Sequence, residues 1–268
     1  MINAEKLIVD SIDLVTCFSP STGELNWMID QVTDGTLTNG SETVYGAGKN
    51  GVNLSALDRN KSASFTLNNG YIVGGVIAAQ TGTAAVKASV SSPLKKVPTH
   101  DIITVAANET TAKLSKTPVG VTGAEVKFVY PLVNGVQDRK LEVDTAPEKG
   151  KSFKIDAASK TLTFATGEFT ADTEIIVFYD YDATEGSKYS NSSNTFSKGG
   201  KVVLDLTCRD ICDNDVIYHT KFVYPNAKID GNFDIAIGDT PAVHAITGNA
   251  LASICSTNKT LWDWYIVE

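Results

Sequence analysis

Apolar and polar residues alternate along several stretches of the chain, with the period of two that a strand with one buried face requires. The clearest example lies within residues 60–68, which are bounded by asparagines. Its side chains form two alternating sets: Ala63, Phe65 and Leu67 in one, and Ser62, Ser64 and Thr66 in the other. We expect a strand here whose apolar side faces a core and whose polar side faces away from it.

The same pattern recurs in residues 228–238. The apolar members are Ile229, Phe233, Ile235 and Ile237, and the polar members are Asp230, Asn232 and Asp234. A period of two places these sets on opposite faces, so we predict a second strand with one wet side. A polar face of this kind is also typical of ordinary outer surface, and the pattern alone leaves both interpretations open.

Further strands are predicted where short apolar runs end at Gly, Pro, Asn or Asp. These runs cover residues 25–29, 201–207, 215–225, 242–252 and 261–267. One helix is predicted within residues 68–82, where apolar residues recur at helical spacing and Gly82 provides a C-terminal stop. Its apolar face would consist of Tyr71, Ile72, Val76, Ile77 and Ala79. Gly74 and Gly75 weaken such a helix by about 1 kcal/mol each relative to alanine.

Residues 32–51 form a long Gly-, Thr- and Asn-rich passage after a predicted strand. Loops longer than about 12–15 residues inside compact domains are usually functional or disordered. Because this passage has too few apolar residues to pack by itself, we expect another subunit to order it. The predicted contact comprises Thr33, Asp34, Gly35, Thr36, Leu37, Thr38, Asn39 and Gly40.

Residues 98–186 differ from their flanks in charge and in pattern. They carry 14 acidic and 9 basic side chains and end where a polar, low-complexity stretch begins, at residues 185–200. Short alternating runs separated by turn residues are typical of a small antiparallel sandwich. We therefore predict an all-β fold with one short α-helix. In it, an immunoglobulin-like β module at 98–186 is inserted into a core made of residues 1–97 and 187–268.

Composition supports β structure and argues against a nucleic-acid-binding protein. Thr, Val and Ile are abundant, and their β-branched side chains favour strands over helices. The 23 basic and 31 acidic side chains give a net charge of −8, which disfavours tight binding to nucleic acid through its phosphates. Because most of the acidic excess falls in residues 98–186, the net charge does not describe the surface of the core.

The first residues and the cysteines suggest neither export nor a metal framework. Residues 1–18 lack a basic segment followed by an unbroken apolar run, so we expect no secretory signal. The longest nearly uncharged stretch, residues 68–86, is interrupted by glycines and is less apolar than a bilayer span requires, so we expect no transmembrane helix. The four cysteines, Cys17, Cys208, Cys212 and Cys255, are expected to be scattered, reduced thiols. Cys208 and Cys212 invite a zinc interpretation, but no second Cys or His pair lies nearby at ligand spacing, so buried thiols are favoured.

Motifs for catalysis are sparse. His219 and His244 lie in predicted strands, where a core or surface role is more common than catalysis. Residues 46–51 superficially match a phosphate loop but lack its hydroxyl residue and its first glycine. The acidic residues around Asp213 lack the third ligand and the turn glycine of a calcium loop. We expect no enzyme, no cofactor and no metal site.

Two stretches carry a series of features in a fixed order. Residues 40–82 contain a Gly-rich approach, a Leu-Asp turn into a polar strand, and a helix ending Ala-Ala-Gln-Thr-Gly. Residues 195–268 contain a Pro-Asn-Ala-Lys step before a strand with Gly-Asp at its end. Together these stretches resemble the major tail tube proteins of bacteriophages with long, non-contractile, siphovirus-like tails. None of the features is a catalytic motif, so the resemblance lies in their order.

The resemblance implies a β-sandwich core with a flanking helix, six copies of which close into a ring. The inner sheets join as one barrel, and rings stack into a tube that carries the module on its outer surface. The implied partners are further copies of the chain, the tape measure protein, the tail terminator and distal tail proteins. Double-stranded DNA would pass during genome ejection without tight binding. The implied location is the virion tail, assembled in the host bacterial cytoplasm without a membrane.

The same resemblance implies a smooth, polar wall around the channel. The residues predicted to face this lumen are the polar members of the two alternating strands: Ser62, Ser64, Thr66, Asp230, Asn232 and Asp234. Pairing between strand edges of neighbouring subunits would satisfy backbone groups that a single copy leaves open.

Two other classes of function are kept as alternatives. An adhesin-like, surface-binding β protein would predict a signal peptide, a wall anchor or a stable monomer. A carbohydrate-active enzyme would require paired carboxylates in a cleft lined by aromatic rings. Trp27, Trp262 and Trp264 are available, but the last two alternate on one predicted strand, as core or interface aromatics commonly do. The role of the module, cell-surface binding or stiffening, is left open by the sequence.

Overall fold

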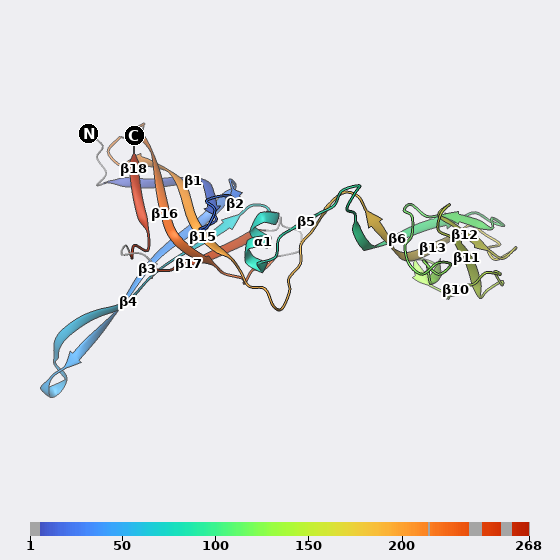
Figure 1. Ribbon diagram of the computed structural model, residues 1–268, viewed down its shortest axis with the longest axis horizontal. Helices are drawn as coiled ribbons and strands as arrows, with labels where there is room; N and C mark the ends of the chain where they lie inside the picture. Colours follow the sequence, from blue (N-terminus) through green and yellow to red (C-terminus); the bar gives the residue numbers. More distant parts are fainter. Residues whose placement is uncertain (1–5, 214, 236–242, 253–258, 268) are drawn as a thin grey trace. The chain divides into compact units, whose positions relative to one another are not determined.

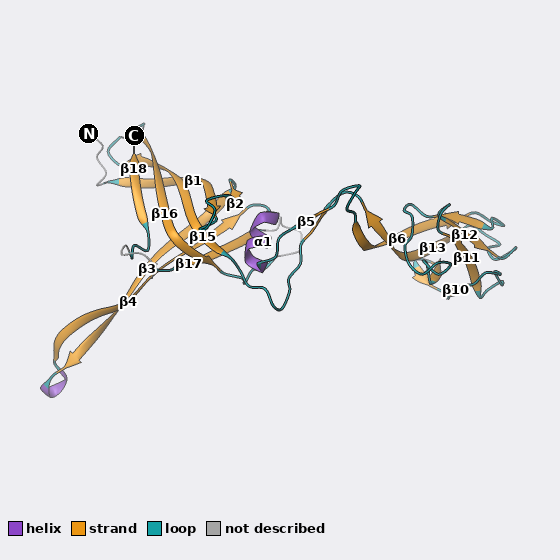
Figure 2. Cartoon of the chain, viewed as in Figure 1, coloured by secondary structure: helices purple, strands orange, loops and turns teal. Residues whose placement is uncertain are grey.

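The fold consists mostly of strands, and its described residues contain one α-helix (Figures 1 and 2). The structure is a computed structural model, and it describes residues 6–213, 215–235, 243–252 and 259–267. The chain forms two compact units. Met1–Ala85 and Tyr189–Glu268 make up the first, called the core unit, and Val86–Lys188 make up the second, called the module. The predicted all-β fold with one short helix is confirmed.

In the described part of the core unit, antiparallel strands follow the order β2-β1-β15-β16-β17-β4-β3, and β18 pairs with β16. Their bounds are β1 Leu7–Phe18, β2 Leu25–Ile29, β3 Val32–Ala47, β4 Asn53–Asn69, β15 Gly199–Asp210, β16 Ile217–Ile229, β17 His244–Ala250 and β18 Asp263–Val267. The sheet curls back on itself, so that β3 approaches β1, although several strands separate them in the sheet. The approach is close: a Cβ atom at Gly35 of β3 would lie 2.9 Å from Ile12 Cδ1 of β1. The result is a nearly closed, barrel-like sheet.

The alternation along β4 builds the core of this unit. Phe65 and Leu67 are 1% and 0% exposed, whereas Ser62 and Thr66 on the other face are exposed. The Phe65 ring packs against Tyr224 of β16, with ring centroids 5.1 Å apart. Complete burial of a side chain of this size contributes about 1.5–3 kcal/mol. The strand predicted at these positions is confirmed.

Helix α1 (Gly74–Thr81) packs onto the same core through Val76 and Ala79. It ends at Gly82, whose φ of +73° lies in the left-handed region that glycine adopts without strain. The predicted C-terminal stop is therefore confirmed.

The beginning of the helix differs from the prediction. Tyr71 and Ile72, expected on its apolar face, precede it and are 44% and 42% exposed. Gly74 and Gly75 consequently occupy the first helical turn. Close approach explains one of these glycines, since a Cβ atom at Gly75 would lie 3.1 Å from Trp27 Cβ. The small residue lets the helix start directly against β2.

The passage at residues 32–51 is a strand and a turn, so the predicted loop is wrong. β3 pairs with β4 from Val32 opposite Asn69 to Ala47 opposite Asn53, and a 3-10 turn, η1 (Lys49–Gly51), joins them. The neighbouring strand supplies the backbone hydrogen bonds, so the passage needs no core of its own. The outer part, residues 42–59, is called the arm; it is the light-blue hairpin that extends from the sheet in Figure 1.

The module contains a second sheet with the strand order β6-β13-β8-β10-β11-β12-β7, and β9 pairs with β8. The bounds are β6 Leu94–Val105, β7 Thr111–Lys113, β8 Phe128–Val133, β9 Val136–Gln137, β10 Leu141–Val143, β11 Ser152–Asp156, β12 Thr161–Phe164 and β13 Thr173–Ala183. Its core includes Phe164, whose ring lies 6.3 Å from Phe153 and 5.0 Å from Phe169. The immunoglobulin-like character of this unit stays a prediction.

The chain enters and leaves the module through one short antiparallel pair. β5 (Val86–Lys87) pairs with β14 (Ser187–Lys188), so that Lys87 lies opposite Ser187. We call this pair the neck. It closes roughly a hundred intervening residues into a loop whose ends are hydrogen-bonded neighbours.

Candidate self-assembly surface

A row of hydroxyl and amide side chains covers one face of β3, β4 and β17. Cross-strand pairing aligns these residues, which are all exposed or half-buried. They are called the polar face and comprise Thr36, Thr38, Ser62, Ser64, Thr66, Thr247 and Asn249. Thr66 lies between Thr36 and Thr247, and Ser64 lies between Thr38 and Asn249. The buried residues of β4 point to the opposite side.

The polar face carries no formal charge at these seven positions. Hydroxyl groups both donate and accept hydrogen bonds, so water satisfies them without a fixed partner. A negative charge lies beside it at Asp34, whose Oδ1 accepts a hydrogen bond from Asn68 Nδ2 at 2.6 Å. None of these seven side chains offers an ammonium or guanidinium group to a polyanion. The next residue in the row of Ser64 and Asn249 is Lys228 of β16, whose Nζ donates to Ser197 O.

The structure brings Ser62, Ser64 and Thr66 together on the polar face, as the alternation predicted. Their partners on β3 and β17 were not predicted from the sequence. Thr36 and Thr38 were assigned to a loop, and no pattern along a single strand shows which strands pair. The alternating polar residues of β3 itself, read as a strand, were the signal that would have found them.

The acidic residues at 230–234 have a different local structure. β16 ends at Ile229, and Asp230 Oδ1 accepts a hydrogen bond from Asn232 N at 3.0 Å, which forms an Asx turn. Asp234 follows this turn outside any strand. The strand predicted at 228–238 therefore ends at Ile229, and one further backbone hydrogen bond joins Asp230 N to Thr247 O at 2.8 Å. Beyond it the local turn replaces the sheet ladder, and within the described residues Ile235 makes only an isolated bridge with His244. Residues 236–238 lie outside the described part of the chain.

The arm exposes apolar side chains on both of its faces. Val44 lies opposite Leu57 on one face, and Tyr45 lies opposite Ala56 on the other. Tyr45 and Leu57 are 56% and 53% exposed, and Leu54 near the turn is 75% exposed. A lone two-stranded hairpin is only marginally stable in water, and exposed apolar patches commonly mark interaction sites. The arm is thus a surface that needs a covering partner.

The predicted contact Thr33–Gly40 lies at the base of this hairpin, within β3. One edge of these residues is paired with β4, from Asp34 opposite Asn68 to Gly40 opposite Ser62. In the described ranges no strand pairs with the other edge of β3. An unpaired edge presents backbone donors and acceptors to any strand that approaches.

A buried polar contact, which the sequence analysis did not predict, fastens α1 to β17. His244 is 0% exposed, and its Nε2 lies 2.8 Å from Gln80 Oε1. Because Gln80 Nε2 donates to Ala245 O at 3.1 Å, Gln80 Oε1 is the acceptor and His244 Nε2 carries the hydrogen. Burial lowers the pKa of His244, which keeps the ring neutral near pH 7. The contact is structural, and His244 belongs to the core.

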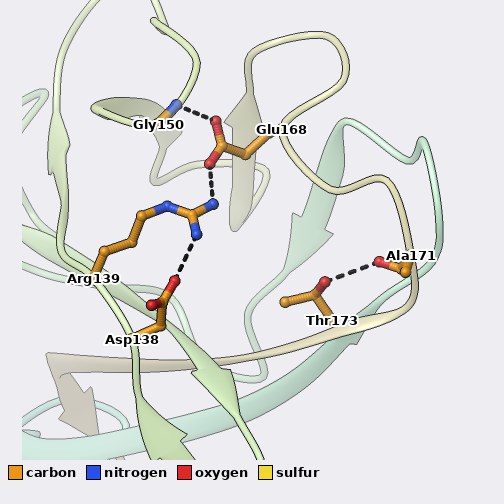
Figure 3. Close-up of polar contacts among 6 residues, drawn as sticks. All are labelled: Asp138, Arg139, Gly150, Glu168, Ala171 and Thr173. Carbon is orange, nitrogen blue, oxygen red and sulfur yellow. Dashed lines mark hydrogen bonds and ion pairs between the residues drawn. The ribbon is translucent and has the colours of Figure 1, made fainter.

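The module holds a buried charge whose partners are complete (Figure 3). Glu168 Oε1 accepts a hydrogen bond from Arg139 Nη2 at 2.7 Å, and its Oε2 accepts one from Gly150 N at 2.6 Å. Arg139 Nη1 also donates to Asp138 Oδ2 at 2.7 Å. The hydrogen bond to Glu168 is the main cause that raises the pKa of Arg139. This cluster joins three loops and leaves neither Glu168 oxygen without a partner.

Among the described residues, no three His, Cys, Asp or Glu side chains converge as metal ligands. Cys208 is buried with its sulfur 3.5 Å from Thr220 Oγ1, Cys212 is exposed, and Cys255 lies outside those residues. No helix in the described ranges has the length and apolar character needed to cross a membrane.

No curated protein matches the sequence. The model of the YomU/Tube protein family matches residues 6–263, which span both units. The resemblance to phage tail tube proteins is thereby confirmed. Because this match covers nearly the whole chain, the chain belongs to the YomU/Tube protein family.

Proposed function

We propose that this chain is the repeating subunit of a phage tail tube, in which six copies close into a ring and rings stack into a conduit for genome ejection. Membership of the YomU/Tube family supports the structural role in the tail. Under this proposal the chain assembles in the bacterial cytoplasm. It then contacts further copies of itself, the tape measure protein, the tail terminator and distal tail proteins.

The arm is the observation that carries the proposal. Its exposed apolar residues have no covering partner within the described residues, and the base of its hairpin presents an open edge of β3. A surface that complements a different surface of the next copy gives head-to-tail contacts, which close into rings or continue as filaments. Burial of the arm by a neighbouring copy would remove its apolar side chains from water.

The polar face suits the wall of the channel. DNA slides most freely over a surface that offers no cation to its phosphates, and the seven positions of the polar face are neutral. We restrict the proposed wall to this face. Of the other predicted lumen residues, Asn232 and Asp234 lie beyond the end of β16, whereas Asp230 adjoins the polar face because its N donates to Thr247 O.

Shortening the arm tests the proposal. Residues 43–58 are replaced by Asn-Gly, which joins Glu42 to Arg59 through a two-residue hairpin turn. Glu42 and Arg59 are paired in the sheet, so the junction preserves the register. Buried residues of β4 begin only at Ala63, so the core unit should fold while tube growth is lost. Negative-stain electron microscopy measures tubes, and tryptophan fluorescence measures folding of the core unit.

A matched variant keeps the arm and removes one of its polar contacts. Thr43→Val removes the 2.7 Å hydrogen bond to Asp58 Oδ1 but retains every apolar side chain of the arm, so tubes should form normally. Normal tubes from the shortened protein would contradict the role of the arm. Deletion of residues 33–41 is a poorer test, because it removes the strand segment in which Gly35 contacts Leu67 of the core.

A further inference from the structure

One face of the module's sheet exposes a row of rings from three adjacent strands. The ring of Phe128 lies 6.3 Å from that of Tyr130 on β8, which lies 6.3 Å from that of Phe178 on β13. Phe178 in turn lies 5.9 Å from His100 on β6. Phe178 is 56% exposed and Phe128 is 36% exposed. Contiguous exposed rings of this kind commonly mark a binding surface.

Three of these rings, those of Phe128, Tyr130 and Phe178, line a hollow of about 360 Å³ that also has polar lining residues. Its lining includes two acidic residues, Glu125 and Asp180, and one basic residue, Lys127. Within the described residues, Glu125 Oε2 is buried and has no hydrogen-bond partner. Buried acceptors without a donor are rare in folded proteins. Because this oxygen is closed to solvent, a ligand hydroxyl reaches it only after the Glu125 side chain moves.

We propose that the hollow binds a carbohydrate. A pyranose ring has an apolar face of C–H groups that can lie against Phe178 or Phe128, and a rim of hydroxyl groups. Each hydroxyl both donates and accepts, so one sugar can donate to Glu125 or Asp180 and accept from Lys127. Aromatic rings, acceptors and a donor lie together in this one hollow, which matches the chemistry of a neutral, polyhydroxylated ligand.

Other ligand classes match the hollow less well. A cationic ligand would compete with Lys140, whose Nζ lies 5.1 Å from the centroid of the Phe128 ring, and with Lys127 in the lining. An anionic ligand would meet the carboxylates of Glu125 and Asp180. An apolar peptide would cover both carboxylates without donating to them, which costs free energy.

Full-length protein tests the proposal. It is immobilised and screened against an array of neutral oligosaccharides that contain glucose, galactose, mannose, rhamnose and N-acetylglucosamine, and bound sugars are titrated by biolayer interferometry. At least one sugar should bind, and Phe178→Ala should weaken that binding by about tenfold or more through loss of the stacked ring. Val133→Ala is the control, because Val133 is 55% exposed on the same strand as Phe128 and does not line the hollow.

Three outcomes would overturn the proposal: no array sugar binds, Phe178→Ala binds as tightly as the parent protein, or Val133→Ala weakens binding equally. Binding of phosphocholine-coated beads in place of the sugars would assign the hollow to a cation, and would also overturn it. The same variants are examined by electron microscopy. Because the proposal does not depend on assembly, Phe178→Ala should still form tubes, and a failure of sugar binding stays distinct from a failure of tube growth.

Discussion

Glu168 keeps a carboxylate away from water, with 0% of its side chain exposed. The hydrogen bonds from its two donors, Arg139 and Gly150, therefore offset the cost of burying this charge in the module. Removal of one partner of a buried ion pair costs about 3–5 kcal/mol when both groups are buried. The Arg139 side chain is 39% exposed, so Arg139→Ala should lower the free energy of unfolding of the module by a smaller amount, about 2 kcal/mol.

Two optical signals separate the units in this measurement. All three tryptophans, Trp27, Trp262 and Trp264, lie in the core unit, whereas far-UV circular dichroism reports both units. Arg139→Ala should shift a transition seen by circular dichroism and leave the tryptophan transition in place. Lys140→Ala, which breaks an exposed ion pair with Glu142, should change neither transition measurably. Equal effects from the two substitutions would show that Glu168 does not need Arg139.

Asp101 is expected to make the stability of the module depend on pH. Burial, the largest single influence, raises the pKa of its carboxyl group, but hydrogen bonds from Ser115 N, Ser115 Oγ and Tyr179 Oη together outweigh burial and lower it. A carboxyl group whose pKa is lowered on folding stabilises the protein at pH values above the pKa that the group has in the unfolded chain. That contribution is lost as the pH falls through the folded pKa.

Asp101→Asn should therefore destabilise the module at pH 7, and the difference from the parent protein should shrink as the pH falls below the ordinary value of 3.8. Urea unfolding followed by circular dichroism at several pH values measures this difference. A difference that stays constant from neutral to acidic pH would attribute the effect to packing and not to the charge.

At the scale of elements, Gly82 decides how α1 ends. Its φ is +73°, and a Cβ atom there would clash with the backbone oxygen of Phe196. Gly82→Ala combines left-handed strain of about 1–2 kcal/mol with a clash against backbone, so the core unit should lose about 3 kcal/mol or more. Gly51 is the matched control, because its φ is +76° and no atom lies within 4 Å of a Cβ there.

Gly51→Ala should cost no more than the strain, about 1–2 kcal/mol. Chemical denaturation followed by tryptophan fluorescence compares the two variants in the core unit. Similar losses from both substitutions would mean that the contact with Phe196 relaxes without cost.

Elements whose conformation is specified by their own residues were predictable from the sequence. The buried and exposed faces of β4 follow from alternation at Phe65 and Thr66, and the end of α1 follows from Gly82. β3 was missed because its conformation comes from pairing with β4, while its own apolar residues, such as Leu37 and Tyr45, are few and exposed. The opposite error arose at Asp230, where alternating residues predicted a continuing strand but the chain forms a local turn.

The candidate surface was predictable only in part, for the same reason. Single-strand alternation found Ser64 and Thr66, but the rows that join them to Thr36 and Thr247 depend on register, which no single strand encodes. The aromatic hollow of the module also combines residues from separate strands. Phe128 and Phe178 are fifty positions apart in the chain and meet only through the pairing of β8 with β13.

At the scale of the whole molecule, a charge placed on the polar face should affect passage of DNA and not assembly. Thr66 is exposed in the middle of that face, so Thr66→Lys introduces an ammonium group where phosphates are proposed to slide. Virions that carry this variant should form normal tails but eject DNA more slowly, most clearly at low salt. The ejection rate is measured as release of DNA from purified virions exposed to their receptor.

Asp234→Lys is the comparison for this experiment, since it introduces a lysine on an exposed residue outside the polar face. It should leave the ejection rate close to that of the parent virus. Equal slowing by both variants, or unchanged ejection with Thr66→Lys, would remove the polar face from the channel wall.

The neck has a practical consequence for the molecule as a scaffold. Because Lys87 and Ser187 are direct partners in an antiparallel pair, the two cut ends left by excision of everything between them would lie only about 5 Å apart. A foreign domain whose own termini are adjacent, such as a fluorescent protein or a small enzyme, can bridge that gap without stretching either end. Each subunit would then display one cargo, and a growing polymer would become a regular array of them.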